Sequence, residues 1–180
     1  PQQLAEHCLR ALAGTRRPRD LAGRTVVVTA GGTREALDPV RYLGNRSSGR
    51  QGWALAEAAR DRGAEVVLVA ANVTLEPPSG VIVVPVVSAE QLRVAVHEAA
   101  PGVDAVVMAA AVADFRPVAV ARSKGKKDDG PPAPVVLEPT ADVLVELVAQ
   151  RTPGQVVVGF AAETGDPGLD WRAHGRAKLA

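Results

Sequence analysis

The chain has 180 residues, the size of one ordinary domain, and 47% of them are hydrophobic, so it can bury a substantial core. Its 21 Lys and Arg residues nearly balance 20 Asp and Glu residues, which argues against broad electrostatic binding of nucleic acid or of an anionic membrane. The single cysteine, Cys8, excludes an internal disulfide and favours a reducing, cytoplasmic location, and no apolar run approaches the roughly 20 residues of a membrane span.

Residues 1–20 predict a short helix followed by an interdomain linker. Apolar side chains recur at helical spacing over residues 2–13, and residues 14–20 then break the pattern with glycine, proline and charge. The segment is interpreted either as a tether to an upstream domain or as an arm that packs on the domain itself. Because the chain starts at Pro1 and stops inside a helical pattern without a stop signal, we expect native neighbours at both ends and a domain, residues 21–180, that is truncated at its C-terminus.

From residue 26 onward, strands and helices alternate. Short β-branched runs predict strands, and alanine-rich runs at helical spacing predict helices. Gly63 is expected to stop the first of these helices, and Ser88 is the expected N-cap of the second. In chain order the predicted elements are strand 26–29, helix 48–62, strand 65–70, strand 81–84, helix 89–100, strand 105–108, an ordered apolar run at 135–137, helix 141–149, strand 155–160 and a helix from about residue 170.

The valine-rich runs carry no polar alternation, which indicates strands buried on both faces, as in a parallel sheet covered by helices. Right-handed crossovers between such strands predict a doubly wound, mostly parallel Rossmann-like α/β sheet with helices on both faces. The regular pattern fails between residues 110 and 134. Within that stretch, residues 123–130 combine charge and glycine with little hydrophobicity, which predicts a mobile loop.

Two glycine clusters follow the first predicted strand. Gly31 and Gly32 permit a tight turn and a close approach of the backbone to a ligand. Ser47 and Ser48 are expected to cap the helix that follows, and Gly49 lets this helix pack closely; its free N–H groups favour an anion. The two clusters therefore predict a phosphate-binding site.

Ligands of doubly wound sheets bind beyond the carboxyl ends of the strands, where the crossovers diverge. The segments that follow predicted strand ends are 30–38, 71–78, 109–116 and 161–164. We expect these four segments to line one crevice.

An NAD(P)-dependent reductase is the alternative interpretation of the glycine clusters. The glycines do not form G-x-G-x-x-G directly after the strand, and no acidic residue closes the second strand, where the chain continues to Asn72. Tyr42 is followed by Arg46 rather than by a lysine at the spacing of short-chain dehydrogenases. The redox interpretation is therefore the weaker one.

Several polar side chains near the glycine clusters are candidates for ligand binding. Arg34, Arg41 and Arg46 could hold a phosphate or carboxylate through bidentate contacts, although a surface arginine alone is usually solvated. The amide of Asn45 can donate to a carbonyl and accept from a hydroxyl, or Asn45 occupies a left-handed turn. Asp114 could accept hydrogen bonds from a base or ribose, hold Mg²⁺, or form an Asx turn.

Lysines gather in the predicted mobile loop at Lys124, Lys126 and Lys127. Such a group is usually a solvated loop. Its expected position opposite the phosphate site makes it a candidate lid, whose lysine would screen negative charge that develops on the substrate.

Four separated segments, residues 28–41, 44–49 (GNRSSG), 108–117 and 158–164, resemble bacterial phosphopantothenate–cysteine ligase. This family is the synthetase half of the bifunctional decarboxylase/ligase of coenzyme A biosynthesis. The segments occur in the family's order, and the resemblance covers the chain from about residue 21 to its end.

The resemblance implies that CTP activates the carboxylate of 4′-phosphopantothenate as an acyl-cytidylate, with loss of pyrophosphate. The amine of L-cysteine then attacks, which gives phosphopantothenoylcysteine and CMP. A carboxylate is a poor acyl donor and CMP supplies a leaving group, so no protein nucleophile is required. The alternative from another class is a nucleotide-binding regulatory domain without turnover.

The resemblance also assigns roles to individual positions. Asn45 would hold the acyl-cytidylate, and Lys124, the first lysine of the family's Lys-Ile-Lys-Lys motif, would serve nucleotide binding and turnover. Arg41 and Arg46 join Asn45 as candidate substrate-binding residues, and Asp114 is the candidate metal ligand. The positions assigned to CTP are Gly31, Gly32, Ser47, Ser48, Gly49, Ala110, Asp114, Lys124, Ala141, Asp142, Val143, Leu144, Phe160 and Lys178.

Two positions depart from the family pattern. The lid reads Lys-Gly-Lys-Lys from Lys124, which predicts a looser loop, and the family's Asn-Pro-Asp is Thr-Ala-Asp at Asp142, which alters the expected cytosine contacts. The family further implies Mg²⁺, a homodimer whose phosphopantothenate site is completed across subunits, and a fused upstream decarboxylase domain that alone would carry FMN.

Overall fold

The computed structural model describes residues 18–124, 134–162, 172 and 175–176. The predicted N-terminal helix at residues 2–13, the predicted lid beyond Lys124 and the start of the predicted last helix near residue 170 lie outside these residues. None of the helices in the described ranges combines the length and apolar character needed to cross a membrane.

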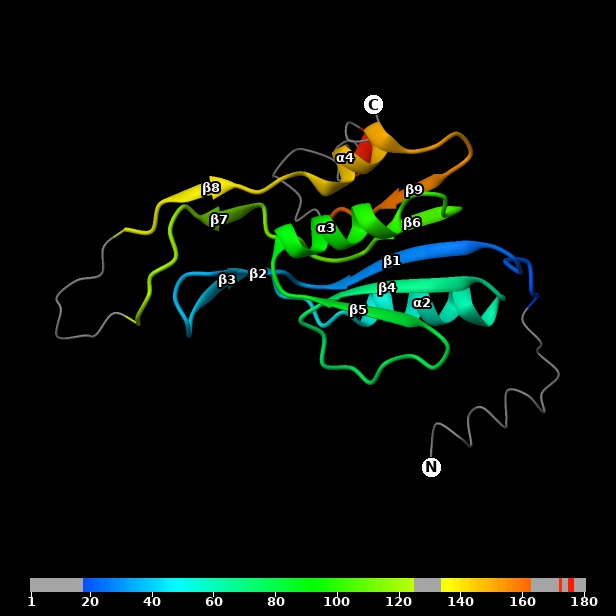
Figure 1. Ribbon diagram of the computed structural model, residues 1–180, viewed down its shortest axis with the longest axis horizontal. Helices are drawn as coiled ribbons and strands as arrows, with labels where there is room; N and C mark the ends of the chain where they lie inside the picture. Colours follow the sequence, from blue (N-terminus) through cyan, green and yellow to red (C-terminus); the bar gives the residue numbers. More distant parts are fainter. Residues whose placement is uncertain (1–17, 125–133, 163–171, 173–174, 177–180) are drawn as a thin grey trace.

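Five strands form a parallel sheet in the order β5-β4-β1-β6-β9 (Figure 1). The chain enters at the centre, winds outward through β4 to β5, and returns to the other side of β1 for β6 and β9. This is the strand order of a Rossmann-like sheet, and its switch point lies between β1 and β6. The predicted fold class is therefore confirmed. The strands are β1 (Thr25–Gly31), β4 (Glu65–Ala71), β5 (Ile82–Val86), β6 (Ala105–Met108) and β9 (Val156–Gly159).

Helices cover both faces of the sheet: α2 (Arg50–Asp61) lies on one face, and α3 (Ala89–Ala99) and α4 (Val143–Gln150) lie on the other (Figure 1). Side chains that alternate along β1 create the two layers. Val28 belongs to the apolar cluster that contains Trp53 of α2, whereas Val27 belongs to the cluster of α3 and α4.

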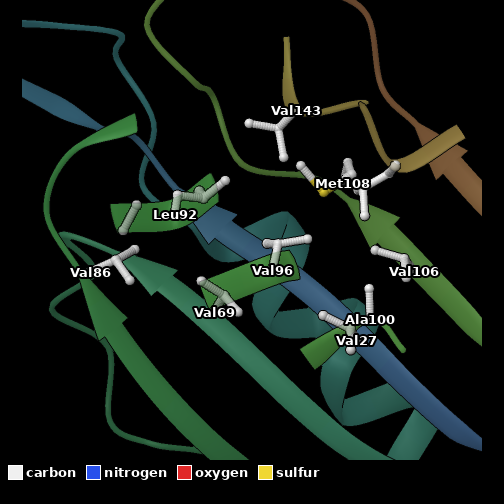
Figure 2. Packing of buried hydrophobic residues seen from close by; sticks show 11 residues of the cluster. Val27, Val69, Val86, Leu92, Val96, Ala100, Val106, Met108 and Val143 are labelled. Atoms are coloured by element: carbon white, nitrogen blue, oxygen red, sulfur yellow. The ribbon is translucent and has the colours of Figure 1, made fainter. Parts of the chain in front are cut away.

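The layer under α3 contains the largest fully buried side chains of that face. Figure 2 shows Leu92 and Val96 of α3 over Val27 and Val69 of the sheet, and all four side chains are 0% exposed. Full burial of each such side chain stabilises the fold by about 1.5–3 kcal/mol. This layer fixes α3 against β1 and β4.

The observed strands of the parallel sheet lie close to the predicted ones. Of the two helix caps that were predicted, one is correct and one is wrong. Ser88 caps α3, since its Oγ accepts a hydrogen bond of 3.2 Å from the main-chain N–H of Gln91. The prediction that a serine caps α2 is wrong. The N-cap is Gly49, with φ 75°, and no side chain caps the helix.

The sequence did not predict four short strands: two in the loop after β1, one in the irregular stretch after β6, and one that begins at the end of the predicted ordered run 135–137. β2 (Arg34–Ala36) pairs antiparallel with β3 (Tyr42–Gly44), and β7 (Phe115–Pro117) pairs antiparallel with β8 (Leu137–Pro139). The main-chain N–H of Ala121 donates to the oxygen of Leu37 at 2.9 Å, which joins the two ribbons. We call residues 34–44, 115–120 and 134–139 the arm; both of its ribbons extend beyond the same end of the sheet (Figure 1).

Candidate functional site at the carboxyl edge of the sheet

A glycine turn ends β1 and contacts the segments that follow both neighbouring strands. Gly31 has φ 87°, and a Cβ at this position would overlap the main-chain oxygen of Ala71. The N–H of Gly32 donates to that same oxygen at 3.1 Å, and the oxygen of Gly31 accepts from Ala111 N–H at 2.7 Å. The tight turn that the sequence predicted is therefore present, and it lies at the switch point of the sheet.

Asn45 joins the loop after β1 to the segment after β6. Its Nδ2 donates to the main-chain oxygen of Val112 at 2.9 Å. Beside it, the buried Thr33 donates its N–H to the oxygen of Ala111 at 3.2 Å and accepts from Ala113 N–H on its Oγ1 at 2.9 Å. Asn45 has φ outside the left-handed region, so the interpretation as a left-handed turn residue is wrong.

A cavity of about 260 Å³ opens beside this junction. It combines residues that follow β1 with one that follows β4. Of the four segments predicted to line one crevice, 30–38 and 71–78 contribute to this cavity, whereas 109–116 and the described residues of 161–164 do not. Its lining residues are Gly32, Arg34, Tyr42, Gly44, Asn45, Arg46, Ser47 and Asn72. Most of these side chains are polar donors, which suits an anionic ligand.

The N-terminus of α2 lies against the glycine turn. A Cβ at Gly49 would lie 3.3 Å from the nitrogen of Gly31, and one at Gly52 would lie 2.5 Å from the oxygen of Thr29, so both glycines are required for close packing. Ser47 Oγ accepts from Gly49 N–H at 3.4 Å, and Ser48 is exposed. Because no side chain caps α2, the N–H groups of its first turn remain free to bind an anion.

The structure separates the three arginines that the sequence grouped together. Arg34 and Arg46 line the cavity, whereas Arg41 lies in the turn at the end of the β2–β3 ribbon and pairs with Asp38 at 2.7 Å. The carboxylate of Asp38 also accepts from the N–H groups of Val40 and Arg41, both at 2.8 Å. These main-chain N–H groups, assisted by the Arg41 guanidinium, hold the pKa of Asp38 below its ordinary value.

Two candidate nucleotide contacts lie in the segment after β6. The N–H of Ala110 donates to Thr29 Oγ1 at 3.0 Å, which ties this segment to β1. Asp114 is exposed, and its main-chain oxygen accepts from Thr140 N–H at 3.0 Å. Thr140 Oγ1 also donates to the oxygen of Ala113 at 2.6 Å. The predicted positions that follow Thr140 are thereby brought next to Asp114.

The candidate positions 141–144 form the start of α4. Asp142 is the N-cap, and its Oδ1 accepts from Val145 N–H at 3.1 Å. The side chain of Val143 is buried in the core, and Leu144 packs against Gly159, so these two residues can offer only main-chain groups to a ligand. Ala141 is exposed at the same end of the helix.

The remaining candidates are spread more widely. Phe160 follows β9 and is exposed, and Lys124 is exposed at the last described position of its segment. Lys126, Lys127 and Lys178 lie outside the described residues. Among the residues that the structure describes, no three His, Cys, Asp or Glu side chains form a metal-binding group. Asp114 would therefore have to share a metal with the ligand itself.

Three residues of this region were not predicted as functional. Asn72, with φ 53°, donates Nδ2 to the oxygens of Gly32 and Val87, both at 2.9 Å. Glu35 is buried, and Tyr42 stacks on a cavity arginine. The sequence signal was the polar residue directly after the second strand, Asn72, which entered the prediction only as the absence of an acidic residue.

The fold and this site define a Rossmann-like α/β domain with a cavity lined by polar side chains at the carboxyl edge of its sheet. Residues 21–180 match the family described as DNA/pantothenate metabolism flavoprotein C-terminal domain, and the chain belongs to this family. The predicted family resemblance is confirmed.

Individual relatives support the same assignment. The chain is 55% identical over 169 residues to the coenzyme A biosynthesis bifunctional protein CoaBC of Mycobacterium tuberculosis, with 90% of this chain and 40% of the relative covered. The corresponding Bacillus subtilis protein is 48% identical over 161 residues, with 89% and 38% covered. A crystal structure of the C-terminal domain of CoaBC matches with a TM-score of 0.74 at 39% identity, covering 88% of this chain and 72% of that one. The chain therefore spans about 40% of the length of its M. tuberculosis relative.

Proposed function

We propose that this chain is the phosphopantothenate–cysteine ligase domain of a coenzyme A biosynthesis protein. It would join 4′-phosphopantothenate to L-cysteine through a 4′-phosphopantothenoyl-cytidylate. The observation that carries the proposal is the position of Asn45, which lies on the cavity wall and is fixed to the segment after β6 by its bond to Val112. One side-chain amide is thus held between an anion-binding cavity and the candidate nucleotide segment.

In the first step, a carboxylate oxygen of 4′-phosphopantothenate attacks the α-phosphorus of CTP, and the bond from that phosphorus to the pyrophosphate oxygen breaks. In the second step, the cysteine nitrogen attacks the acyl carbon, the bond to CMP breaks, and the amine loses a proton. Both steps join bound reactants, so the protein contributes mainly orientation and charge stabilisation. The amide of Asn45 uses one N–H for Val112, and its other polar groups would position the acyl-cytidylate.

The nucleotide would lie along the edge formed by the glycine turn, the α2 N-terminus and the α4 N-terminus. The free N–H groups of the first turn of α2 suit phosphate oxygens, and Ser47 and Ser48 lie beside them. Asp114 and residues 141–144 would hold the cytidine end, to which Phe160 and Lys178 would contribute. Lys124 would arrive with the lid and neutralise negative charge on the phosphates.

Mg²⁺ fits this site only as a partner of the CTP phosphates. The described residues offer no cluster of metal ligands, and Mg²⁺ characteristically retains waters and binds one or two carboxylates together with substrate phosphates. Asp114, an exposed carboxylate at this edge, is the candidate protein ligand. When bound, the ion would neutralise phosphate charge.

The proposal includes a homodimer formed through the arm, a fused upstream flavin-dependent decarboxylase domain and a cytoplasmic location. The arm exposes an unusual number of apolar side chains, and a second copy could cover them. They are Val40, Tyr42, Leu43, Phe115, Val118, Val120, Val135, Val136 and Leu137. Light scattering of the native protein, compared with a Val136→Lys variant, tests this part: the variant should be monomeric.

The decisive experiment incubates the native protein with CTP, Mg²⁺ and 4′-phosphopantothenate and measures pyrophosphate with and without cysteine. A ligase releases about one equivalent of pyrophosphate without cysteine, as acyl-cytidylate accumulates, and turns over continuously with it. CTP binding without pyrophosphate release would instead identify a non-catalytic nucleotide-binding domain. Tight binding of NAD(P)H without CTP binding would identify a reductase.

A further inference from the structure

The cavity beside Asn45 carries positive charge that no cavity side chain neutralises. Arg34 and Arg46 line it, and none of its eight lining residues is acidic. Elsewhere in the arm the cations are paired, because Arg41 lies 2.7 Å from Asp38 and Arg116 lies 2.8 Å from Glu138. Two guanidinium groups around one hollow without a carboxylate favour an anionic occupant.

Arg34 is exposed, and its guanidinium group stacks on a neighbouring aromatic ring. Its guanidinium carbon lies 4.7 Å from the centre of the Tyr42 ring, within the range of a cation–π interaction. Arg34 and Tyr42 lie on paired strands of the same ribbon, where Arg34 is opposite Gly44 and Tyr42 is opposite Ala36. A Cβ at Gly44 would lie 2.5 Å from the main-chain oxygen of Thr33, so glycine permits the close approach of the two strands here. A guanidinium ordered in this way loses less conformational entropy when it binds a ligand.

The strand that carries Arg34 is anchored on both sides. The main-chain N–H of Arg34 donates to the oxygen of Val87 at 2.9 Å. Its neighbour Glu35 is buried and accepts from Ala89 N–H, in the first turn of α3, at 2.8 Å. Side chains alternate along a strand, so burial of Glu35 leaves Arg34 on the exposed side.

Asn72, the residue directly after β4, also helps to hold this region in place. Its Nδ2 donates to the oxygens of Gly32 and Val87, which links the glycine turn to the loop that receives Arg34. Asn72 is therefore a positioning residue, because its two hydrogen bonds fix the glycine turn relative to Val87, the residue after β5.

We propose that Arg34, stacked on Tyr42 and assisted by Arg46, is a phosphate-binding residue of this cavity. The planar guanidinium fork matches two oxygens of a phosphate group. The inference rests on the proposed function for the source of the phosphate, which is either the departing pyrophosphate of CTP or the phosphate of 4′-phosphopantothenate. Both sources present the same chemistry to Arg34.

The test measures calorimetric binding of each compound to the native protein in Mg²⁺ buffer, with no turnover required. Inorganic pyrophosphate and 4′-phosphopantothenate are titrated separately into wild type, Arg34→Ala and Arg34→Lys. Loss of a charge-assisted hydrogen-bond pair should weaken one of the two ligands by about tenfold to a hundredfold in the alanine variant, with partial recovery in the lysine variant. Arg151→Ala is the matched control, because Arg151 follows α4 and is exposed at the opposite edge of the sheet.

Tyr42 provides a second and independent variant pair. Tyr42→Phe keeps the ring and should retain wild-type binding, whereas Tyr42→Leu should weaken the same ligand that Arg34→Ala weakens, by a smaller factor. Selective loss of pyrophosphate binding assigns the subsite to the nucleotide, and selective loss of 4′-phosphopantothenate binding assigns it to the acid. Unchanged affinity for both compounds in Arg34→Ala overturns the proposal.

These outcomes are distinct from failure of the proposed function. A protein that binds pyrophosphate through Arg34 but forms no amide would retain the phosphate subsite and lose the ligase assignment. An Arg34→Ala protein that forms the amide and binds both compounds with wild-type affinity would retain the ligase assignment and lose the proposed phosphate subsite.

Discussion

The side-chain amide of Asn45 and the main-chain oxygen of Val112 are 2.9 Å apart, although 67 positions separate them in the chain. The bond connects the loop after β1 with the segment after β6, which flank the switch point of the sheet. Ligands of doubly wound sheets bind at this point. Asn45 therefore couples the shape of the cavity to the segment that leads to Asp114.

Asn45→Asp should preserve the fold and impair the reaction. The substitution replaces the N–H donor by a carboxylate that faces the Val112 oxygen, and it brings negative charge next to phosphates. We expect kcat to fall by about a hundredfold, the typical effect of losing one oriented donor. Pyrophosphate release with and without cysteine measures which half-reaction is affected.

The fold of this variant needs its own measurement, because Asn45 is also a structural link. Removal of one partly exposed hydrogen bond should lower the free energy of unfolding by only about 0.5–1.5 kcal/mol. Near-wild-type turnover in a correctly folded Asn45→Asp protein would contradict the assigned role.

Gly31→Ala should be strongly destabilising for two separable reasons. The residue has φ 87°, and a Cβ would overlap the Ala71 oxygen, so both backbone strain and overpacking arise. Their sum is about 2–5 kcal/mol. Gly23 is the control for backbone strain alone, because it has φ 74° and no atom lies within 4 Å of the place that a Cβ would take. Gly23→Ala should lower the free energy of unfolding by only about 1–2 kcal/mol. Denaturant unfolding of the two variants measures the difference, and equal losses would show that the contact with Ala71 is unimportant.

Asp38 should make stability depend on pH in the acidic range. The N–H groups of Val40 and Arg41 lower the pKa of the folded protein's Asp38 below its ordinary value of 3.8. A carboxylate with a depressed pKa stabilises the folded state above its unfolded pKa, and this contribution disappears as the pH falls through the folded pKa. Asp38→Asn should therefore be less stable than wild type at neutral pH, and the difference in stability should shrink as the pH falls through the folded pKa of Asp38. Thermal unfolding across pH 2–7 tests this, and a gap that stays constant with pH would contradict it.

Local sequence patterns were sufficient to predict the central sheet. Valine-rich runs specify buried parallel strands without reference to distant residues, and the Ser88 cap lies within three residues of its partner Gln91. The two ribbons of the arm could not be predicted in this way. Their strands are three residues long, and β7 and β8 pair across about twenty intervening positions. Neither strand shows enough alternation to stand out.

Some residues of the candidate site could also be predicted from local sequence, and others could not. The glycine turn could be predicted because tight turns restrict residue type locally, whereas Asn45 was chosen from its place in the family motif at residues 44–49. The buried Glu35 was missed because its partner, the N–H of Ala89, is 54 positions away. The capping of α2 was predicted incorrectly because a serine before a helix usually caps it, whereas close packing against Val73 and Gly31 here requires a left-handed glycine.

Gln155 offers a prediction about stability at the other edge of the sheet. Its side chain is buried, and Nε2 donates to the oxygens of Ala100 at 2.8 Å and Val103 at 3.0 Å, which closes the turn between α3 and β6. Gln155→Leu removes both hydrogen bonds; the Ala100 oxygen still accepts from Val103 N–H at 3.4 Å, whereas the Val103 oxygen loses its Gln155 donor. The free energy of unfolding should therefore fall by about 1–3 kcal/mol.

The matched control for this variant is Gln150→Leu, because Gln150 is exposed at the end of α4. We expect the control to change stability by less than about 0.5 kcal/mol. Both variants are compared by denaturant unfolding and by pyrophosphate release at a temperature where both are folded. Because Gln155 precedes β9 and lies away from the carboxyl edge, its loss should leave kcat unchanged. Normal stability of Gln155→Leu would contradict the structural role of the two hydrogen bonds. Impaired turnover of the fully folded variant would show that Gln155 also affects the reaction.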